Sequence, residues 1–321
     1  MSVRAFLGDA ALKAATLDRV RIRWEARQIM PLIYMKWSPD RGFASLTGTI
    51  GETGDPEAFT GRTGIPLELA LLCETLINAG ISFVDDPEAP FGTTLSGDDR
   101  ILAFGIEWLE ALDVAHELSS VVSRFLPVFL SGMMSDDIPL VQHVSPEVRA
   151  AADDIVALWT RELQGEAVSR QEWRAVRAGA LCASEASSEP AAYPFAELVE
   201  SLPWSISGFA PEFPAICHSF LHGLLQALAA ELLSPQDRAI WAKAANGART
   251  LARARGEQRF AGASDEAILS HLPDVERAMF ENSQPAVMSR MSAAKNSARR
   301  LMTRMLRQQM DQILGLLRSD S

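Results

Sequence analysis

Recurring helix start signals constrain the fold of this sequence more than any other feature. Ser145 precedes Pro-Glu at the head of an apolar-periodic run, and Ser234 precedes Pro and then Asp237 in the same way. Ser169 has Glu172 three positions later, which is the spacing of a capping box. Caps of this kind satisfy the free backbone N–H groups at a helix start. These cap signals therefore predict a series of helices along the chain.

Apolar residues at helical spacing predict further helices between these signals. The expected segments are 8–34, capped by Asp9 and ended or kinked by Pro31, then 67–78 closing at Gly80, a helix starting near Gly97, and 117–130. Together with the capped segments they predict an all-α fold, a multi-helical body of eight or more helices.

The segment 37–66 differs in kind, because glycine, serine and threonine replace large apolar residues there. Thirty such residues make an improbably long bare loop in a compact protein. We expect either a short β-hairpin around 43–50 or a functional flap, and no other β structure. Its position predicts an insertion within an N-terminal helical region, 1–185. A Pro-rich connection, 186–214, is expected to join that region to a C-terminal helical region, 215–321.

Charge is unevenly distributed along a chain whose formal net charge is −11. Residues 85–200 hold 21 acidic and 7 basic side chains, whereas 235–318 hold 8 acidic and 14 basic ones. Either the two regions neutralise each other, or the acidic middle is an exposed face that attracts a basic partner. We expect exposure, because the carboxylates outnumber the cations available to them. The candidate interaction residues of this face are three carboxylate pairs, Asp85 and Asp86, Asp98 and Asp99, and Asp136 and Asp137. None has the third carboxylate of a DDxxD magnesium motif.

The last expected helix is basic and amphipathic. Arg299, Arg300 and Arg304 belong to its cationic face and are further candidate interaction residues. Nucleic acid or an anionic membrane is possible as a partner only through this helix. The opposite stripe is expected to be buried, which would make the helix structural; it comprises Met288, Met291, Leu301, Met302 and Met305.

His218 and His222 are the best metal candidate in the sequence, because they lie one helical turn apart. Such a pair lacks the glutamate of HExxH, and a structural pair is the stronger interpretation. No nucleophile elbow, phosphate-binding loop or CxxC motif occurs, so we expect no cofactor and no metal. The wide spacing of Cys73, Cys182 and Cys217 and the lack of a membrane-length apolar run favour a cytoplasmic protein.

Several stretches resemble an uncharacterised family of bacterial cytosolic proteins that has no assigned function. They are AFLGDAALKAATLDRVR, TGIPLELALLCETLI, WLEALDVAHELSSVVSRF, SRQEWRAVRAG and the terminal QQMDQILGLLR. The similarity extends over most of the chain and consists of packing patterns. Members of that family carry a Cys/His-bearing loop after the first helix, where this chain reads RGFASLTGTIGETGD. A metal or thiol role therefore does not carry over.

Two hypotheses about function remain. The first is a non-enzymatic cytosolic interaction protein, such as an adaptor, a regulator or an immunity protein, which binds a basic protein partner through its acidic face. The second is a helical enzyme or ligand-binding protein with a pocket beneath 37–66. In that case Trp37, Arg41 and Arg62 would lie at the pocket mouth and His218 and His222 inside. The sequence leaves open whether the protein is an enzyme, and it favours a protein without catalytic activity. It does not indicate an oligomeric state.

Overall fold

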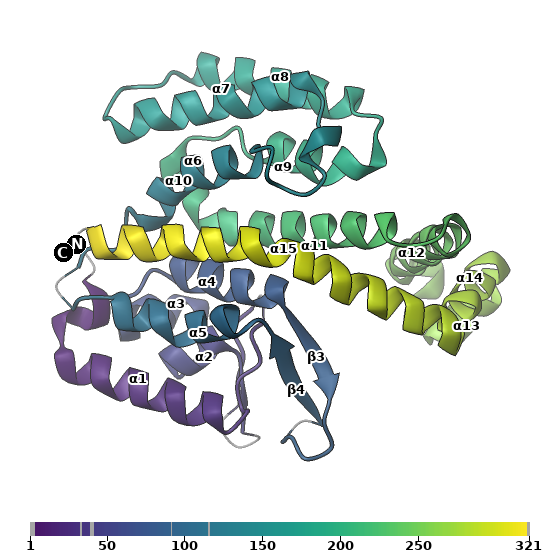
Figure 1. The fold of residues 1–321 in the computed structure, drawn as a ribbon, viewed down its shortest axis with the longest axis horizontal. Coiled ribbons are helices and arrows are strands. Elements are labelled where there is room, and N and C mark those ends of the chain that lie inside the picture. Colours follow the sequence, from purple (N-terminus) through teal and green to yellow (C-terminus); the bar gives the residue numbers. More distant parts are fainter. Residues whose placement is uncertain (1–3, 33, 39–41, 91, 115, 320–321) are drawn as a thin grey trace. The chain divides into compact units, whose positions relative to one another are not determined.

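The computed structural model describes residues 4–32, 34–38, 42–90, 92–114 and 116–319, most of which are helical (Figure 1). The predicted all-α, multi-helical fold is confirmed. The chain forms two compact units: unit 1 comprises Met1–Leu224 and Arg299–Ser321, and unit 2 comprises Leu225–Ala298. The division therefore falls at these positions and not in the predicted connection 186–214.

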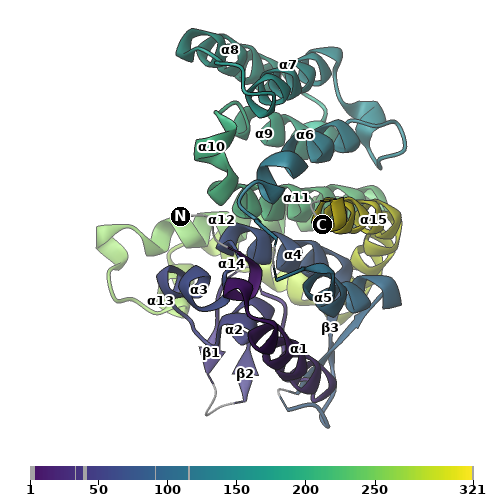
Figure 2. The ribbon, with the colours of Figure 1, turned by 90° about the vertical axis from the view of Figure 1, so that its left-hand side faces the viewer.

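The first half of unit 1 contains short elements followed by longer helices. They are the 3-10 turn η1 (Ala5–Gly8), α1 (Ala10–Glu25), β1 (Trp37–Ser38), β2 (Phe43–Ala44), α2 (Leu46–Gly51), α3 (Pro56–Thr63), α4 (Leu67–Gly80), β3 (Ile81–Asp85), β4 (Thr93–Gly97) and α5 (Asp99–Ala111). Figure 2 shows α1, α2 and α3 together with the β1–β2 hairpin. The sequence signals placed the starts of α1 and α5 correctly, since Asp9 caps α1 and Asp98 caps α5.

The second half of unit 1 is a helical layer, and the boundary between the units falls inside its last helix. Its elements are α6 (Val121–Met133), η3 (Val141–His143), α7 (Pro146–Leu163), α8 (Arg170–Ala186), η4 (Pro190–Ala192), α9 (Tyr193–Ser201), α10 (Ile206–Phe209), η5 (Ala210–Glu212) and α11 (Phe213–Glu231). Ser145 caps α7, and Ser169 with Glu172 forms the predicted capping box of α8. Residues 190–212, expected as a connection, are thus short helices of this layer.

Unit 2 is built from α12 (Pro235–Arg255), η6 (Gln258–Phe260), α13 (Asp265–Ser270), α14 (Pro273–Ser283) and the start of α15 (Pro285–Ser319). The predicted cap Ser234 accepts the backbone N–H of Asp237. The Asp237 carboxylate also pairs with Arg290 at 2.7 Å, and this hydrogen bond lowers the pKa of Asp237. A small core of Leu251, Ala254, Phe260, Ile268 and Val275 holds the unit together.

Helix α1 ends at Glu25, well before the Pro31 at which it was expected to stop. The backbone N–H of Gln28 donates to the carbonyl of Arg23, and that of Arg27 donates to Trp24. Arg27 takes a left-handed φ of 56°. These bonds form a Schellman-type end, which usually relies on glycine at the left-handed position. Because arginine occupies it here, no local signal predicts this helix end.

The segment 37–66 contains two short helices, α2 and α3, as well as a hairpin, and the hairpin expected at 43–50 is wrong in position. Strands β1 and β2 pair Trp37 with Ala44, and helix α2 begins directly afterwards. The side chain of Ser45 accepts the N–H of Gly48 and thereby caps α2. Every residue of α2 is buried. A buried, capped helix is a structural element of the unit, so residues 46–51 do not form the functional flap that was the alternative expectation.

Gly64 supplies a left-handed residue at the end of α3, where no side chain fits. Its φ is +66°, and a Cβ there would lie 2.0 Å from the carbonyl oxygen of Arg4. Gly61, inside the same helix, has no heavy atom within 4 Å of such a Cβ. We therefore expect Gly64→Ala to lower the free energy of unfolding by more than about 2 kcal/mol. Gly61→Ala should raise it by up to about 1 kcal/mol. Urea titration of both variants checks the pair, and equal stabilities would contradict this account.

A buried carboxylate joins α2 to α4. Glu74, which is fully buried, accepts four hydrogen bonds: from the backbone N–H of Leu32 and of Leu46, each at 2.8 Å, and from the N–H and hydroxyl of Thr47, at 3.0 and 2.5 Å. Burial nevertheless raises its pKa to about 7. Glu74 thus fixes the start of α2 and the irregular stretch around Leu32 through backbone donors that would otherwise be unsatisfied.

A second hairpin, β3–β4, contradicts the prediction that 37–66 holds the only β structure. It begins directly after Gly80, pairs Ile81 with Gly97 and Asp85 with Thr93, and closes through the N–H of Asp86 and the carbonyl of Gly92. Ile81 is buried, whereas Phe83 and Val84 are each close to half exposed. The hairpin is therefore anchored at one end and exposed toward its turn.

An aromatic core runs through the layer formed by α6, α9, α10 and α11. The ring of Phe129 meets Phe213 at 5.1 Å and Phe220 at 6.1 Å between centroids. Phe220 also meets Phe195 of α9 at 5.4 Å. Edge-on aromatic pairs of this kind add to the free energy of burial. They fix α9 against α11.

Residues Ala210–Glu231 are long and apolar enough, by length and composition alone, to cross a membrane. Half of the most apolar window is buried inside the protein. The core helices of globular proteins have both properties, so this is weak support for a membrane segment.

Candidate interaction groove

Two neighbouring hollows in unit 1 form a groove beside α11. The first, of about 370 Å³, lies between α9 and α11, and the second, of about 450 Å³, lies between the 201–209 segment and α11. They share Ser201 and Ile216. Apolar side chains make much of the lining, namely Pro194, Leu198, Ile216 and Phe220 in the first hollow and Trp204, Phe209 and Ile216 in the second.

The charged residues that line the groove are all acidic. Glu197 and Glu200 line the first hollow, Glu212 lines the second, and all three are exposed. Their environment in the sequence reinforces this charge, because no lysine or arginine occurs between Arg177 and Arg238. The groove therefore combines an apolar floor with an anionic rim.

Trp204 is an exposed aromatic side chain that the surrounding structure holds in place. Its side chain is 49% exposed. The guanidinium of Arg177 stacks 3.6 Å from the ring centroid, and the carbonyl of Trp204 accepts the indole N–H of Trp159 at 2.8 Å. A fixed, exposed tryptophan beside a hollow is a common anchor in protein interfaces, because little entropy is lost when it is covered.

Glu162 helps to fix the same segment from α7. Its carboxylate accepts the backbone N–H of Ile206 at 2.7 Å and the indole N–H of Trp173 at 3.0 Å. The first contact satisfies a backbone donor beside the groove, and the second satisfies the indole N–H of Trp173 in α8. The groove wall is thus held in place by part-buried polar contacts as well as by apolar packing.

Sequence reasoning missed this groove because the stretch that forms it was interpreted as a connection. Its prolines suggested a hinge, yet four of the five lie in helices: Pro190 in η4, Pro194 in α9, Pro211 in η5 and Pro214 in α11. Two signals could have revealed it. The run between Arg177 and Arg238 lacks every Lys and Arg, and Glu197 and Glu200 lie three positions apart on one helical face.

The predicted carboxylate pairs are dispersed over unit 1. Asp86 pairs with Arg27 at 2.7 Å and Asp136 with Arg149 at 3.2 Å, while Asp85 and Asp99 are exposed. Neighbouring carboxylates in the sequence thus have different partners. The acidic middle of the sequence is not one continuous row of these pairs.

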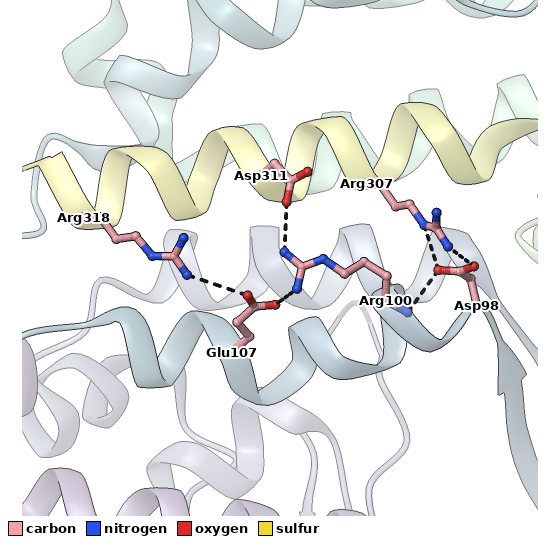
Figure 3. Close-up of polar contacts among 6 residues, drawn as sticks. All are labelled: Asp98, Arg100, Glu107, Arg307, Asp311 and Arg318. Carbon is pink, nitrogen blue, oxygen red and sulfur yellow. Dashed lines mark hydrogen bonds and ion pairs between the residues drawn. The ribbon is translucent and has the colours of Figure 1, made fainter.

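The C-terminal half of α15 pairs with a few carboxylates of the acidic middle, and most of the 21 acidic residues there take no part in these pairs (Figure 3). Arg307 donates to Asp98 from Nε at 2.9 Å, and this contact lowers the pKa of Asp98. In the same ladder Asp311 accepts from Arg100 at 3.0 Å, and Arg318 lies 3.7 Å from Glu107. Exposed pairs of this kind each contribute about 0 to 1 kcal/mol. The main effect of the ladder is therefore to align α15 with α5, and it adds little to the stability of the fold.

The three arginines predicted as interaction residues differ in their surroundings. Arg304 is largely exposed and lies 3.9 Å from Asp137, and Arg300 is exposed. Arg299 is half-buried, and its burial lowers the pKa of its guanidinium. The structure does not bring them together with the six aspartates as one surface.

The predicted burial of the α15 stripe is confirmed at Met291, Met302 and Met305 and wrong at Met288 and Leu301. Met288 is 47% exposed and Leu301 51% exposed. The buried stripe instead includes Val287, Ala298 and Leu306. Met288 and Leu301 each lie one residue from a buried position, which is about 100° around the helix, and so point away from the stripe.

His218 and His222 lie on α11 with their rings stacked at 6.0 Å between centroids. Partial burial and the neighbouring His222 lower the pKa of His218. Within the described part of the chain, no group of three or more His, Cys, Asp or Glu side chains is placed to hold a metal ion. A metal role for the pair stays untested.

The residues predicted for a pocket beneath 37–66 have separate local contacts. The guanidinium of Arg23 lies 4.6 Å from the ring centroid of Trp37, and Arg62 donates to the carbonyl of Glu52 at 3.0 Å. Arg41 lies outside the described residues. The ligand-binding hypothesis for this segment stays a prediction.

Comparison with known proteins adds no relative. No protein-family model, no curated protein and no solved structure matches this chain. The resemblance to a bacterial family therefore also stays a prediction.

Proposed function

We propose that this protein is a non-enzymatic, cytoplasmic interaction protein that binds a basic segment of a protein partner in the groove beside α11. The observation that carries the proposal is the anionic rim over an apolar floor, at Glu197, Glu200 and Glu212 around Ile216. An adaptor, a regulator or an immunity protein would use such a surface. The proposal keeps the acidic face of the first hypothesis and relocates it from the aspartate pairs to these glutamates.

The chemistry of the groove selects the partner. An apolar floor covers the apolar side chains of a bound segment, and the free energy of binding comes mainly from that burial. The glutamates on the rim accelerate encounter with a basic segment and disfavour acidic ones. A partner with alternating basic and apolar side chains fits both parts.

Charge reversal at the rim tests the proposal. We expect Glu197→Lys with Glu200→Lys to weaken partner binding at least about tenfold, through electrostatic repulsion of the basic segment. Both side chains are exposed, so the fold should persist. Partners are captured from extracts of the native host and identified by mass spectrometry. Binding of the purified partner is then measured at low and high salt.

The same stretch of chain provides a matched control. Glu185→Lys with Glu189→Lys makes the same change in charge at exposed positions outside the two hollows. This control should retain most of the affinity. If both double variants weaken binding equally, net charge and not the groove attracts the partner, and the proposed site is wrong.

A further inference from the structure

The β3–β4 hairpin of unit 1 is an incomplete sheet. It has two strands, and β4 lies beside the segment 24–30 across a hollow of about 140 Å³. Two-stranded sheets are only marginally stable unless another element packs on them. Phe83 and Val84 point to opposite faces, because side chains alternate along a strand, yet they are 46% and 45% exposed. Both faces are therefore uncovered near the turn.

The hydrogen-bonding register shows which backbone groups of β3 point outward. The N–H of Asp86 bonds to Gly92, which makes this pair a hydrogen-bonded one. Hydrogen-bonded and non-hydrogen-bonded pairs alternate in an antiparallel ladder. The pair of Val84 with Thr94 is therefore bonded, and Phe83 and Asp85 direct their N–H and C=O groups away from β4.

These outward groups form an open edge. Among the described residues, Phe83 and Asp85 make no backbone hydrogen bond outside the hairpin. An exposed edge with apolar side chains is a template for another strand, which natural proteins normally protect. Here the residues near the edge that discourage pairing with another strand are two acidic ones, Asp85 and Glu88, and Pro87.

We infer that the β3 edge binds an extended basic peptide segment of another protein as a third strand, a binding site separate from the groove. Main-chain hydrogen bonds to Phe83 and Asp85 would supply the affinity, and Phe83 and Val84 would contact alternate side chains. A lysine or arginine opposite Asp85 would form a favourable cross-strand pair.

Charge and size disfavour a second copy of this chain as the occupant. The formal net charge of −11 makes two copies repel each other. In antiparallel self-pairing centred on Phe83, Asp85 would lie opposite the buried Ile81. An edge this short also buries far less than the roughly 1,000 Å² of a stable interface.

Amide hydrogen exchange with a synthetic probe tests the inference on the full chain. The probe is the acetylated and amidated heptapeptide KVKVKVK, and its control is the same peptide N-methylated at every residue. The control has the same charge but none of the seven residues has a backbone N–H to donate. We expect the probe to slow exchange at the amides of Phe83 and Asp85, and not at that of Val84, which β4 already protects. The methylated peptide should slow neither.

Two variants at one position separate the backbone from the side chain. Phe83→Ala removes the aromatic ring, and Phe83→Pro removes the ring and the outward N–H, so Phe83→Pro should weaken probe binding about tenfold relative to Phe83→Ala, the equivalent of roughly 1.4 kcal/mol. Equal binding of the two peptides, equal binding of the two variants, or no protection at Phe83 and Asp85 at millimolar probe would overturn the inference. Protection of Phe83 in the protein alone that is lost on dilution would show that a second copy occupies the edge, which would also overturn it.

Discussion

Leu306→Ala is expected to lower the free energy of unfolding of unit 1 by about 3 kcal/mol, whereas Leu301→Ala should lower it by less than about 1 kcal/mol. Leu306 is fully buried, while Leu301, on the same helix, is 51% exposed. Removing a buried leucine side chain costs its transfer free energy and leaves a cavity, at about 2 to 5 kcal/mol in all. An exposed leucine contributes little of either.

The measurement is urea unfolding of the two variants and the wild type, monitored by circular dichroism. The same substitution in the same helix makes Leu301→Ala a control for helix propensity. A loss at Leu301 as large as that at Leu306 would mean that the stripe of α15 is packed differently. Similar stability for all three proteins would mean that α15 is dispensable and its role is functional.

Glu74→Gln is expected to abolish a pH dependence of stability that the wild type shows between about pH 4.5 and 7. The pKa of Glu74 in the folded protein is about 7, above its ordinary value of 4.5, because the carboxyl group is fully buried. The folded protein therefore binds this proton at a higher pH than the unfolded chain does. The contribution of Glu74 to the free energy of unfolding should fall as pH rises through this window, by on the order of 3 kcal/mol, and level off above it.

Urea titrations of the wild type and of Glu74→Gln at pH 5, 6, 7 and 8 isolate this contribution. His218, whose pKa is lowered, changes stability in the opposite direction in part of the window, but it is common to both proteins and cancels in their difference. Glu68→Gln, on the same helix and partly exposed, is the control and should keep the wild-type slope. A wild-type slope in Glu74→Gln would show that another group titrates.

Local sequence signals correctly predicted the helices of this protein that begin with a polar cap. Ser145, Ser169 and Ser234 each cap a helix where the sequence predicts one, since a cap acts on backbone groups within three residues. The end of α1 escaped prediction because a left-handed arginine, Arg27, replaces the expected glycine. The strand Ile81–Asp85 escaped because a short apolar run is equally compatible with helix and strand.

The sequence by itself also determined the overall helical class and the excess of acidic residues, because periodicity and charge are properties of neighbouring residues. Only the tertiary structure decided where the acidic side chains have partners and where they surround an apolar hollow. Asp98 meets Arg307 across more than two hundred positions of chain, and Glu200 and Ile216 meet at the groove through the packing of α9 on α11. Contacts of this range depend on how helices pack, and helix packing depends on side chains that no local pattern brings together.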